Sequence, residues 1–217
     1  MTNKISDINF SECMGCEKLN KIIEKNDLNG HENQKGTDKG TSHSYLPVYE
    51  SIFDNFLEKK ENISVLEIGI QYGGSIFSWY ELHEGSYIIG IDINDNNINY
   101  DLIEKMQKDR YSIIIDNAYS DNIVAQIKSK FPNGIDFIVD DGPHSIDSQI
   151  KFIEMYLPLL TGDGIAVIED IASSSYLQIL ENKVLEDHPN MSYIIQKVDR
   201  QHIKGRYDDL MLIIQKI

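Results

Sequence analysis

Cysteine is scarce in this chain of 217 residues, which contains only Cys13 and Cys16. A structural zinc site takes four ligands. His31 and His43 would have to complete such a site, and their spacing fits no standard zinc finger. A redox Cys-x-x-Cys pair usually follows a strand in a βαβ unit, and this pair does not. Zinc and redox roles are therefore disfavoured, and we assign these thiols no function.

Positive charge is scarce as well. The chain has 20 Lys and Arg against 35 Asp and Glu, which gives a formal net charge of -15. Proteins that bind nucleic acid normally carry a basic stripe, and the sequence contains none. The charge therefore argues against DNA or RNA as a partner, while it favours solubility and tolerates bound cations.

Long apolar runs are also missing. No stretch reaches the roughly 18 consecutive apolar residues that a transmembrane helix requires. The opening segment, MTNKISDINF, lacks the apolar run of a signal peptide. We therefore expect a cytoplasmic protein without a membrane partner.

The composition that remains is typical of a globular protein, with 41% hydrophobic and 25% charged residues. The length predicts one domain with a small appendage. We predict that residues 1–60 form an N-terminal cap or lid of short helices and loops, and that residues 61–217 form the main domain. Within the cap, residues 45–60 have helical spacing of their apolar side chains.

Strands and helices are expected to alternate through the main domain. Five continuous apolar runs are typical of parallel strands that are covered on both faces; they lie at 64–70, 86–93, 111–116, 135–140 and, after a TGDG turn, 164–170. Helical patterns separate them or follow the last, at 75–83, 100–108, 121–131 (with Asp121 as N-cap), 146–160 and 176–187. Two further strands, 191–198 and 209–217, are joined by a polar loop and should pair antiparallel. The predicted fold is α/β: a doubly wound, mostly parallel seven-stranded sheet, Rossmann-like, with an antiparallel C-terminal hairpin at one edge.

Glycines and acids follow the first predicted strands, where ligands bind in open α/β sheets. Strand one ends at Glu67 and Gly69, and Gly73-Gly74 then allow a ligand to approach the backbone at the start of the next helix. The alternative is a tight turn without a ligand. Strand two ends in Asp92, about where a ribose diol would be held. The spacing Gly-x-x-x-Gly-Gly is not the dinucleotide pattern Gly-x-Gly-x-x-Gly, which disfavours a dehydrogenase.

This glycine segment resembles motif I of class I S-adenosylmethionine-dependent methyltransferases, Glu-x-Gly-x-x-x-Gly. The resemblance implies S-adenosylmethionine as the cofactor. It implies that Asp92 binds the ribose hydroxyls and that Asp116, after strand three, lies near the adenine. The cofactor contacts expected from this resemblance and from the strand ends are Glu67, Gly69, Gly73, Gly74, Ser75, Asp92, Asp116, Asn117, Ala118 and Asp140, of which Asp140 is the most ambiguous.

Strands four and five end in a cluster of titratable groups. Strand four delivers Asp140, Asp141 and His144, and strand five delivers Glu169 and Asp170. Without a partner, these carboxylates would repel one another. A divalent cation relieves that repulsion, and hard oxygen ligands suit Mg²⁺, with Mn²⁺ or Ca²⁺ as alternatives. The competing interpretation is that these residues only cap helices or lie in solvent.

The cluster also resembles a narrower group, the metal-dependent sugar O-methyltransferases that tailor macrolide and rhamnosyl antibiotics. Those enzymes carry Asp-Gly-Ser-His after strand four, where this chain has Asp-Gly-Pro-His at 141–144. They also carry a Glu-Asp pair after strand five and a Thr-Asp-Lys-Gly stretch, which matches GTDKGTSHSYLPVY at 36–49. The resemblance implies Asp141, Glu169 and Asp170 as metal ligands, His144 as general base, and His43, Tyr45 and Tyr49 as residues that close the cofactor or substrate pocket.

These observations predict a metal-dependent O-methyltransferase whose acceptor is a small molecule, most simply one that contains a sugar. A vicinal diol would chelate the metal, His144 would take the proton, and the alkoxide would attack the methyl group. Catechol-type diols are rival acceptors, and a non-catalytic cofactor-binding module is the alternative class. RNA 2′-O-methyltransferases use a Lys-Asp-Lys-Glu set, and we expect no lysine at the strand ends. We expect specificity to lie in the front segment, residues 1 to about 40, and in loops 172–178 and 199–209; a homo-oligomer remains open.

Overall fold

A seven-stranded sheet forms the centre of the computed structural model, which describes residues 3–30 and 36–217. The strand order across the sheet is β3-β2-β1-β4-β5-β7-β6. The strands are β1 Ile63–Ile68, β2 Ser86–Asp92, β3 Tyr111–Ile115, β4 Ile135–Asp140, β5 Leu160–Ile168, β6 Tyr193–Asp199 and β7 Leu210–Lys216. The chain reverses its direction of travel across the sheet between β1 and β4, which makes their carboxyl ends the expected ligand-binding edge.

Strand pairing confirms the predicted fold class. β1 pairs in parallel with β2 and β4, and the parallel ladder continues to β3 on one side and β5 on the other. β7 pairs antiparallel with both β5 and β6, so the C-terminal hairpin lies at one edge. The predicted TGDG turn is wrong in one respect, because β5 begins at Leu160 and includes these residues. The pairing of β5 with β4 shifts register between Ile135 and Phe137. This irregularity accommodates the additional residues that β5 has in its TGDG segment.

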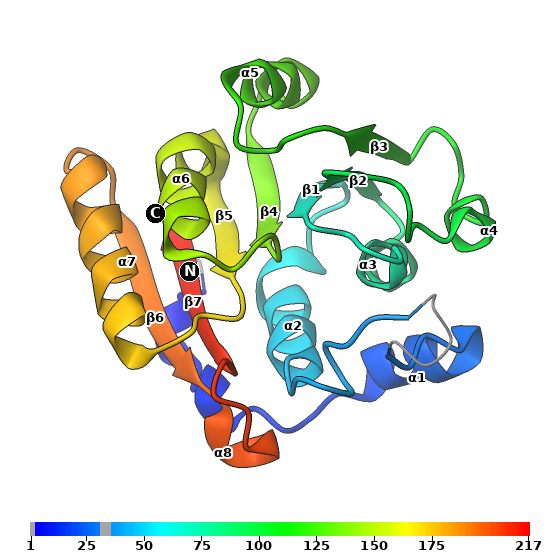
Figure 1. Cartoon of the computed structure of the whole chain (residues 1–217), viewed down its shortest axis with the longest axis horizontal. Coiled ribbons are helices and arrows are strands. Elements are labelled where there is room, and N and C mark those ends of the chain that lie inside the picture. The colour runs from blue at the N-terminus through cyan, green and yellow to red at the C-terminus, as the bar shows by residue number, and fades with distance from the viewer. Residues whose placement is uncertain (1–2, 31–35) are drawn as a thin grey trace.

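Helices cover both faces of the sheet (Figure 1). The helices are α1 Glu17–Asn26, α2 Leu46–Ile52, α3 Gly74–Leu82, α4 Tyr100–Ile103, α5 Asp121–Lys130, α6 Ile146–Tyr156, α7 Ser174–Asp187 and α8 Gln201–Lys204. One buried apolar cluster joins α1, α2 and α3 to the sheet, and a second joins α5, α6 and α7 to its other face. Because both faces are buried at β1, β2, β4 and β5, these strands require the continuous apolar runs seen in the sequence, whereas the edge strand β3 is only partly buried.

Further local predictions differ from the structure. The helix expected at 146–160 ends at Tyr156, and the expected loops 172–178 and 199–209 contain the start of α7 and all of α8. The helix expected at 100–108 is confined to the four residues of α4. The N-cap of α5 is Ser120 rather than Asp121, because the Ser120 side chain accepts a hydrogen bond from the Ile123 N–H. Asp121 is instead the first helical residue, where its charge favours the helix dipole.

The segment before β1 packs into the same core as the sheet. Besides α1 and α2, the described residues of this segment include the short helical turns η1 Ile5–Asp7, η2 Phe10–Glu12 and the π-helical η4 Phe53–Leu57, which extends α2. The Glu50 carboxylate accepts hydrogen bonds from the backbone N–H groups of Glu17 and Leu19 at 2.8 and 2.6 Å. A side chain of α2 thus satisfies the orphan N–H groups at the start of α1.

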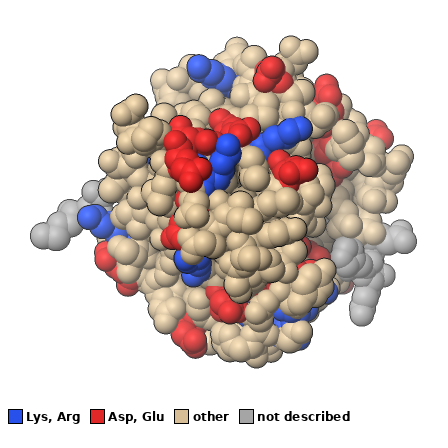
Figure 2. Space-filling model, turned by 60° about the vertical axis from the view of Figure 1, so that its left-hand side comes forward, with Lys and Arg blue, Asp and Glu red and all other residues tan. Residues whose placement is uncertain are grey.

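The surface on the α7 side carries mixed charge. Figure 2 shows acidic and basic side chains interspersed on this face. The Lys183 ammonium, for example, lies 2.6 Å from Glu154 and 2.9 Å from Asp187. Within the described residues, no helix combines the length and the apolar character that crossing a membrane would require.

Candidate active site

A cavity of about 550 Å³ opens at the carboxyl ends of the strands. Its size falls in the range of pockets that hold small molecules and cofactors, about 300–1,000 Å³. The predicted cofactor residues that line it are Gly69, Asp92, Asp116, Asn117 and Ala118. Asp141, His144 and Asp170 line the same cavity. One continuous space therefore connects the glycine end of the site to the acidic end.

Asp92 organises the loop that follows β1. One oxygen of its carboxylate accepts hydrogen bonds from the backbone N–H groups of Ile70 and Gln71 at 3.1 and 3.0 Å. Gln71 has a positive φ of 44°, an unusual backbone conformation for a residue with a side chain. The Asp92 contacts hold this loop at the rim of the cavity.

Gly69 and Gly74 of the motif must each be glycine for a different steric reason. Gly69 has a φ of +80°, and a Cβ there would lie 1.9 Å from the Asp141 carbonyl oxygen. A Cβ on Gly74 would lie 2.4 Å from the carbonyl oxygen of Gly36. Gly69 thus allows the ends of β1 and β4 to meet, and Gly74 allows the front loop to lie against the start of α3.

Five predicted cofactor residues do not line the cavity: Glu67, Gly73, Gly74, Ser75 and Asp140. Glu67 is fully buried and accepts a hydrogen bond of 2.7 Å from the Trp79 indole N–H. Burial raises the pKa of Glu67 above its ordinary value, against the opposing effect of Lys39. Its role in this structure is to tie β1 to α3.

Asp140 lies behind the cavity wall. The Tyr119 hydroxyl, which itself lines the cavity, donates a hydrogen bond of 2.6 Å to the Asp140 carboxylate. Burial raises the pKa of Asp140 to about 7, although the bonds from Tyr119 and the Gly142 N–H oppose this rise. Asp140 thus fixes the turn after β4 from below, a role that the sequence left ambiguous.

Asp141, His144 and Asp170 form the group that faces the cavity. Their potential ligand atoms all lie within 4.8 Å of one another. The His144 Nε2 atom lies 3.7 Å from Asp141 Oδ1 and 3.7 Å from Asp170 Oδ2. His144 and Asp170 both have left-handed backbones, with φ of 56° and 52°. Such conformations cost about 1–3 kcal/mol each and cluster at functional sites.

Glu169 is not brought into this group. Its side chain is 2% exposed, and the carboxylate lies 2.6 Å from the Lys39 ammonium and accepts a hydrogen bond from the Tyr49 hydroxyl. Burial raises the pKa of Glu169 well above its ordinary value, while Lys39 acts in the opposite direction. The role of Glu169 as a metal ligand therefore stays a prediction that the contacts of this carboxylate do not favour.

Lys39 is the residue that sequence reasoning missed. Its side chain is 1% exposed, and its ammonium lies 2.6 Å from Asp141, 2.6 Å from Glu169 and 3.6 Å from Glu67. The expectation that no lysine lies at the strand ends is wrong, because Lys39 reaches them from the front loop. The signal that could have identified Lys39 was the Thr-Asp-Lys-Gly stretch, which resembles a motif of the metal-dependent sugar O-methyltransferases.

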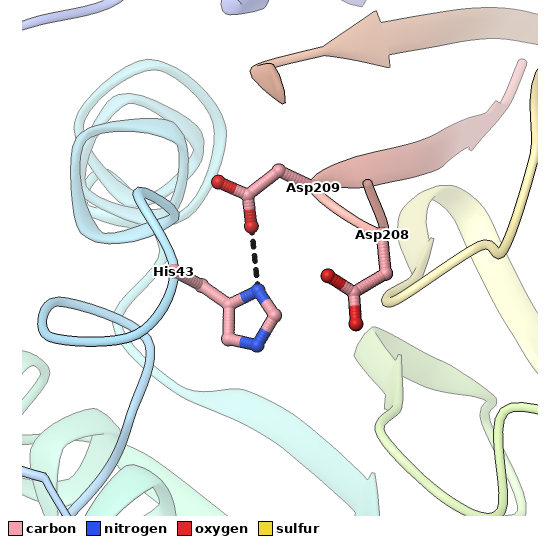
Figure 3. Close-up of side chains that lie close together, drawn as sticks. All are labelled: His43, Asp208 and Asp209. Atoms are coloured by element: carbon pink, nitrogen blue, oxygen red, sulfur yellow. Dashed lines mark hydrogen bonds and ion pairs between the residues drawn. The ribbon is translucent and has the colours of Figure 1, made fainter. Parts of the chain in front are cut away.

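His43 and Tyr45 support the acids from behind, and neither they nor Tyr49 line the cavity. The Tyr45 hydroxyl donates a hydrogen bond of 2.7 Å to Asp170 Oδ1, and its ring stacks on His43. Figure 3 shows His43 directed at Asp209, with Asp208 beside it on the loop before β7. The His43 Nδ1 atom lies 2.6 Å from Asp209 and 3.3 Å from Asp170. This contact joins the front loop to the C-terminal hairpin.

Neither cysteine joins a candidate metal group in the described part of the chain. Cys16 is buried, and burial together with nearby Glu50 raises the pKa of its thiol to about 12. His31, considered with the cysteines as a zinc ligand, lies outside the described residues.

The chain is similar to known proteins in part of its sequence and in its fold. Residues 66–171 match a family model, Methyltransf_24, described as a methyltransferase domain. Among solved structures, MycE methyltransferase of the mycinamycin biosynthetic pathway, in complex with Mg, SAH and mycinamycin VI, superposes with a TM-score of 0.67 at 16% identity over 93% of this chain. This chain spans only 55% of that protein. An O-methyltransferase from Bacillus cereus in complex with SAH superposes at 0.59 and 15% identity, covering 98% of this chain and 95% of that one. No curated protein sequence matches significantly.

The family match and the fold point in one direction. Residues 66–171 are similar to a methyltransferase domain, and they include the cavity-lining ends of β1, β2, β4 and β5. In fold, the chain resembles MycE over most of its own length.

Proposed function

We propose that this protein is an S-adenosylmethionine-dependent and divalent-metal-dependent O-methyltransferase that acts on a hydroxyl of a sugar-containing small molecule. The observation that carries the proposal is the convergence of Asp141, Asp170 and His144 on the cavity that Asp92 and Asp116 also line. Methyl transfer to a hydroxyl requires a base and a methyl donor in one space, and this cavity offers room for both.

The cofactor would lie at the glycine end of the cavity. Gly69 presents backbone without a side chain there, and Asp92 and Asp116 offer carboxylates after β2 and β3. Carboxylates at these positions suit hydroxyl and amino groups of a nucleoside. Two solved neighbours of similar fold contain SAH, which supports this choice of cofactor.

The acidic end fits a hard divalent cation. Asp141 and Asp170 direct one carboxylate oxygen each toward His144 and the cavity, and oxygen ligands with adjoining space suit Mg²⁺, with Mn²⁺ or Ca²⁺ as alternatives. The similar MycE structure contains Mg. The proposal rests on Asp141 and Asp170, because Glu169 is engaged by Lys39 and Tyr49.

His144 is the residue proposed to move a proton. Its side chain is 37% exposed, and it lies at the boundary between the acids and the cavity. When bound, S-adenosylmethionine supplies the methyl group, and a divalent cation lowers the pKa of a hydroxyl in contact with it. His144 takes the hydroxyl proton at Nε2, the atom that lies 3.7 Å from Asp141 and 3.7 Å from Asp170. The walls of the cavity align the acceptor and exclude bulk water.

A vicinal diol is the acceptor chemistry that suits two carboxylates beside a base. A sugar diol is favoured by the similarity to MycE, whose structure contains mycinamycin VI. A catechol offers a similar pair of oxygens and is the rival acceptor class. A module that binds the cofactor without catalysis is the alternative from another class.

The test is methyl transfer from labelled S-adenosylmethionine to a panel of glycosides and catechols, before and after treatment with EDTA. We expect transfer to a glycoside diol, loss of transfer in EDTA and recovery with Mg²⁺. Full activity of the metal-stripped protein would contradict the metal role. Transfer to catechols alone would change the acceptor class. Absence of S-adenosylmethionine binding by calorimetry would contradict the function as a whole.

A further inference from the structure

Lys39 lies at the centre of the acidic end although it belongs to the loop before α2. Its ammonium bridges Asp141 after β4 and Glu169 after β5, with both distances at 2.6 Å. The backbone of the loop is fixed as well, because the Lys39 carbonyl accepts hydrogen bonds from Tyr45 and Leu46. The ammonium is therefore held by the fold rather than by chance surface pairing.

The oxygen atoms of the three acids divide into two sets. Glu169 uses Oε2 for Lys39 and Oε1 for the Tyr49 hydroxyl. Asp141 uses Oδ2 for Lys39, and Asp170 uses Oδ1 for the Tyr45 hydroxyl. The remaining oxygens, Asp141 Oδ1 and Asp170 Oδ2, are the ones that face His144, each at 3.7 Å.

We propose that Lys39 is a positioning residue that keeps Glu169 out of the metal shell, so that the cation is bound by Asp141 and Asp170 beside His144. Lys39 orients Asp141 through one oxygen and leaves the other for the cation. It also serves as the permanent counter-ion of Glu169. This inference deepens the proposed function and rests on it, because it assigns which acids hold the metal.

The charge balance of the site supports this division. Glu67, Asp141 and Glu169 lie around one ammonium, and a cation that took Glu169 would have to displace this buried lysine from its carboxylate partners. Stripping a buried ammonium of its partners is strongly destabilising. A cation bound by Asp141 and Asp170 leaves all Lys39 contacts in place. Its positive charge offsets the negative charge of these two acids.

The test is Mn²⁺ binding to the full-length protein saturated with SAH, measured by calorimetry and by the electron paramagnetic resonance of free Mn²⁺. Four variants are compared with the wild type: Asp170→Asn, Glu169→Gln, Lys39→Met and the double variant Lys39→Met/Glu169→Gln. Asp163→Asn and Lys60→Met are matched controls, because they alter a lysine–carboxylate pair at the opposite end of β5. Asp141→Asn replaces Asp170→Asn if that variant is poorly folded.

We expect Asp170→Asn to weaken Mn²⁺ binding at least about tenfold, because it removes a ligand. Glu169→Gln should change the affinity by less than about threefold, because it touches no ligand directly. Lys39→Met should tighten binding by about tenfold, because it frees Glu169 and one oxygen of Asp141, and adding Glu169→Gln should remove most of that gain. A loss in Glu169→Gln as large as that in Asp170→Asn would overturn the inference.

The failure of the proposed function is distinguishable from the failure of this inference. If the wild type binds no Mn²⁺ but Lys39→Met does, the lysine occupies the place of the cation. Both the metal role and the positioning role of Lys39 are then overturned. If neither binds, the metal role fails and the assignment of its ligands fails with it; urea unfolding of metal-free protein then tests only whether Lys39 and Glu169 are paired. If the wild type binds Mn²⁺ and Glu169→Gln loses it, this inference alone fails and the metal role stands. If Lys39 and Glu169 are paired, adding Glu169→Gln to Lys39→Met should raise the midpoint of urea unfolding. A further fall of the midpoint would contradict the pairing.

Discussion

At both the amino ends and the carboxyl ends of β4 and β5, a lysine lies between two carboxylates. These two clusters, the amino-end cluster and the carboxyl-end cluster, differ in kind. At the amino ends, Lys60 lies 2.8 Å from Asp136 of β4 and 2.8 Å from Asp163 of β5. At the carboxyl ends, Lys39 lies 2.6 Å from Asp141 and 2.6 Å from Glu169. The residue types and distances are thus similar, so composition alone does not separate a structural cluster from a site.

Burial separates them. The Lys60 side chain is 21% exposed and Asp163 46%, whereas Lys39 is 1% and Glu169 2% exposed. Burial raises the pKa of Asp136, but hydrogen bonds from Lys60 and Ser64 outweigh it and hold this pKa below its ordinary value. For Glu169 burial prevails, and its pKa lies well above the ordinary value. The amino-end cluster is satisfied, while the carboxyl-end cluster holds excess negative charge beside a cavity.

The largest effect that would test this comparison is on turnover. We expect His144→Ala to lower kcat by about 10²–10⁴-fold, the usual contribution of a general base, with S-adenosylmethionine affinity nearly unchanged. His83→Gln is the control at the amino ends, where the His83 ring bonds to the Lys60 carbonyl. It should leave kcat of the folded enzyme within about twofold. Collapse of cofactor binding in His144→Ala would make His144 a structural or cofactor-binding residue.

Stability should separate the two lysines. Lys39→Met leaves buried carboxylates without their partner and should lower the free energy of unfolding by about 3–5 kcal/mol. Lys60→Met removes partly exposed pairs and should lower it by about 0–1 kcal/mol. Urea unfolding of the metal-free proteins measures both values. Equal losses would show that burial does not distinguish the clusters.

Two glycines extend the same comparison to the backbone. Gly69→Ala forces a Cβ to 1.9 Å from the Asp141 carbonyl oxygen at a φ of +80°. We expect a loss of at least about 2 kcal/mol in unfolding free energy and a weaker cofactor affinity. At Gly162 in β5, a Cβ would meet no atom of the described chain within 4 Å. Gly162→Ala should therefore change stability by less than about 0.5 kcal/mol, and a larger loss than in Gly69→Ala would refute this steric reading.

The smallest effect concerns acid stability at the amino ends. Asp136 has a lowered folded-state pKa, so its contribution to stability is present above its unfolded pKa of about 3.9 and is lost as pH falls through the lower folded value. The difference in unfolding free energy between the wild type and Asp136→Asn should therefore be about 1 kcal/mol at pH 6 and shrink below about pH 4. A difference that grows on acidification would have the wrong sign.

Much of the fold was predictable because burial on both faces imposes a visible pattern. The continuous apolar runs gave the parallel strands, and the terminal pair gave the antiparallel hairpin. Local errors arose where competing signals were close in strength, as at Asp121, where the neighbouring Ser120 caps the helix. The short α4 reflects a weak helical pattern that packing does not extend.

The site was predictable only where strand ends bring residues together. Asp141 and Asp170 follow neighbouring parallel strands, so their meeting follows from topology. Lys39 lies 102 residues before Asp141 and 130 before Glu169, in a loop without periodicity, and no register links it to the sheet. The same holds for the contact of His43 with Asp209, which spans 166 residues.

The most direct test of the account is a crystal structure of the protein with SAH and Mn²⁺, in which anomalous scattering locates the metal. We predict Mn²⁺ in the cavity on the carboxylates of Asp141 and Asp170, with Lys39 still paired to Glu169. Mn²⁺ bound by Glu169 in the present position of the Lys39 ammonium, or no Mn²⁺ in this cavity, would contradict it.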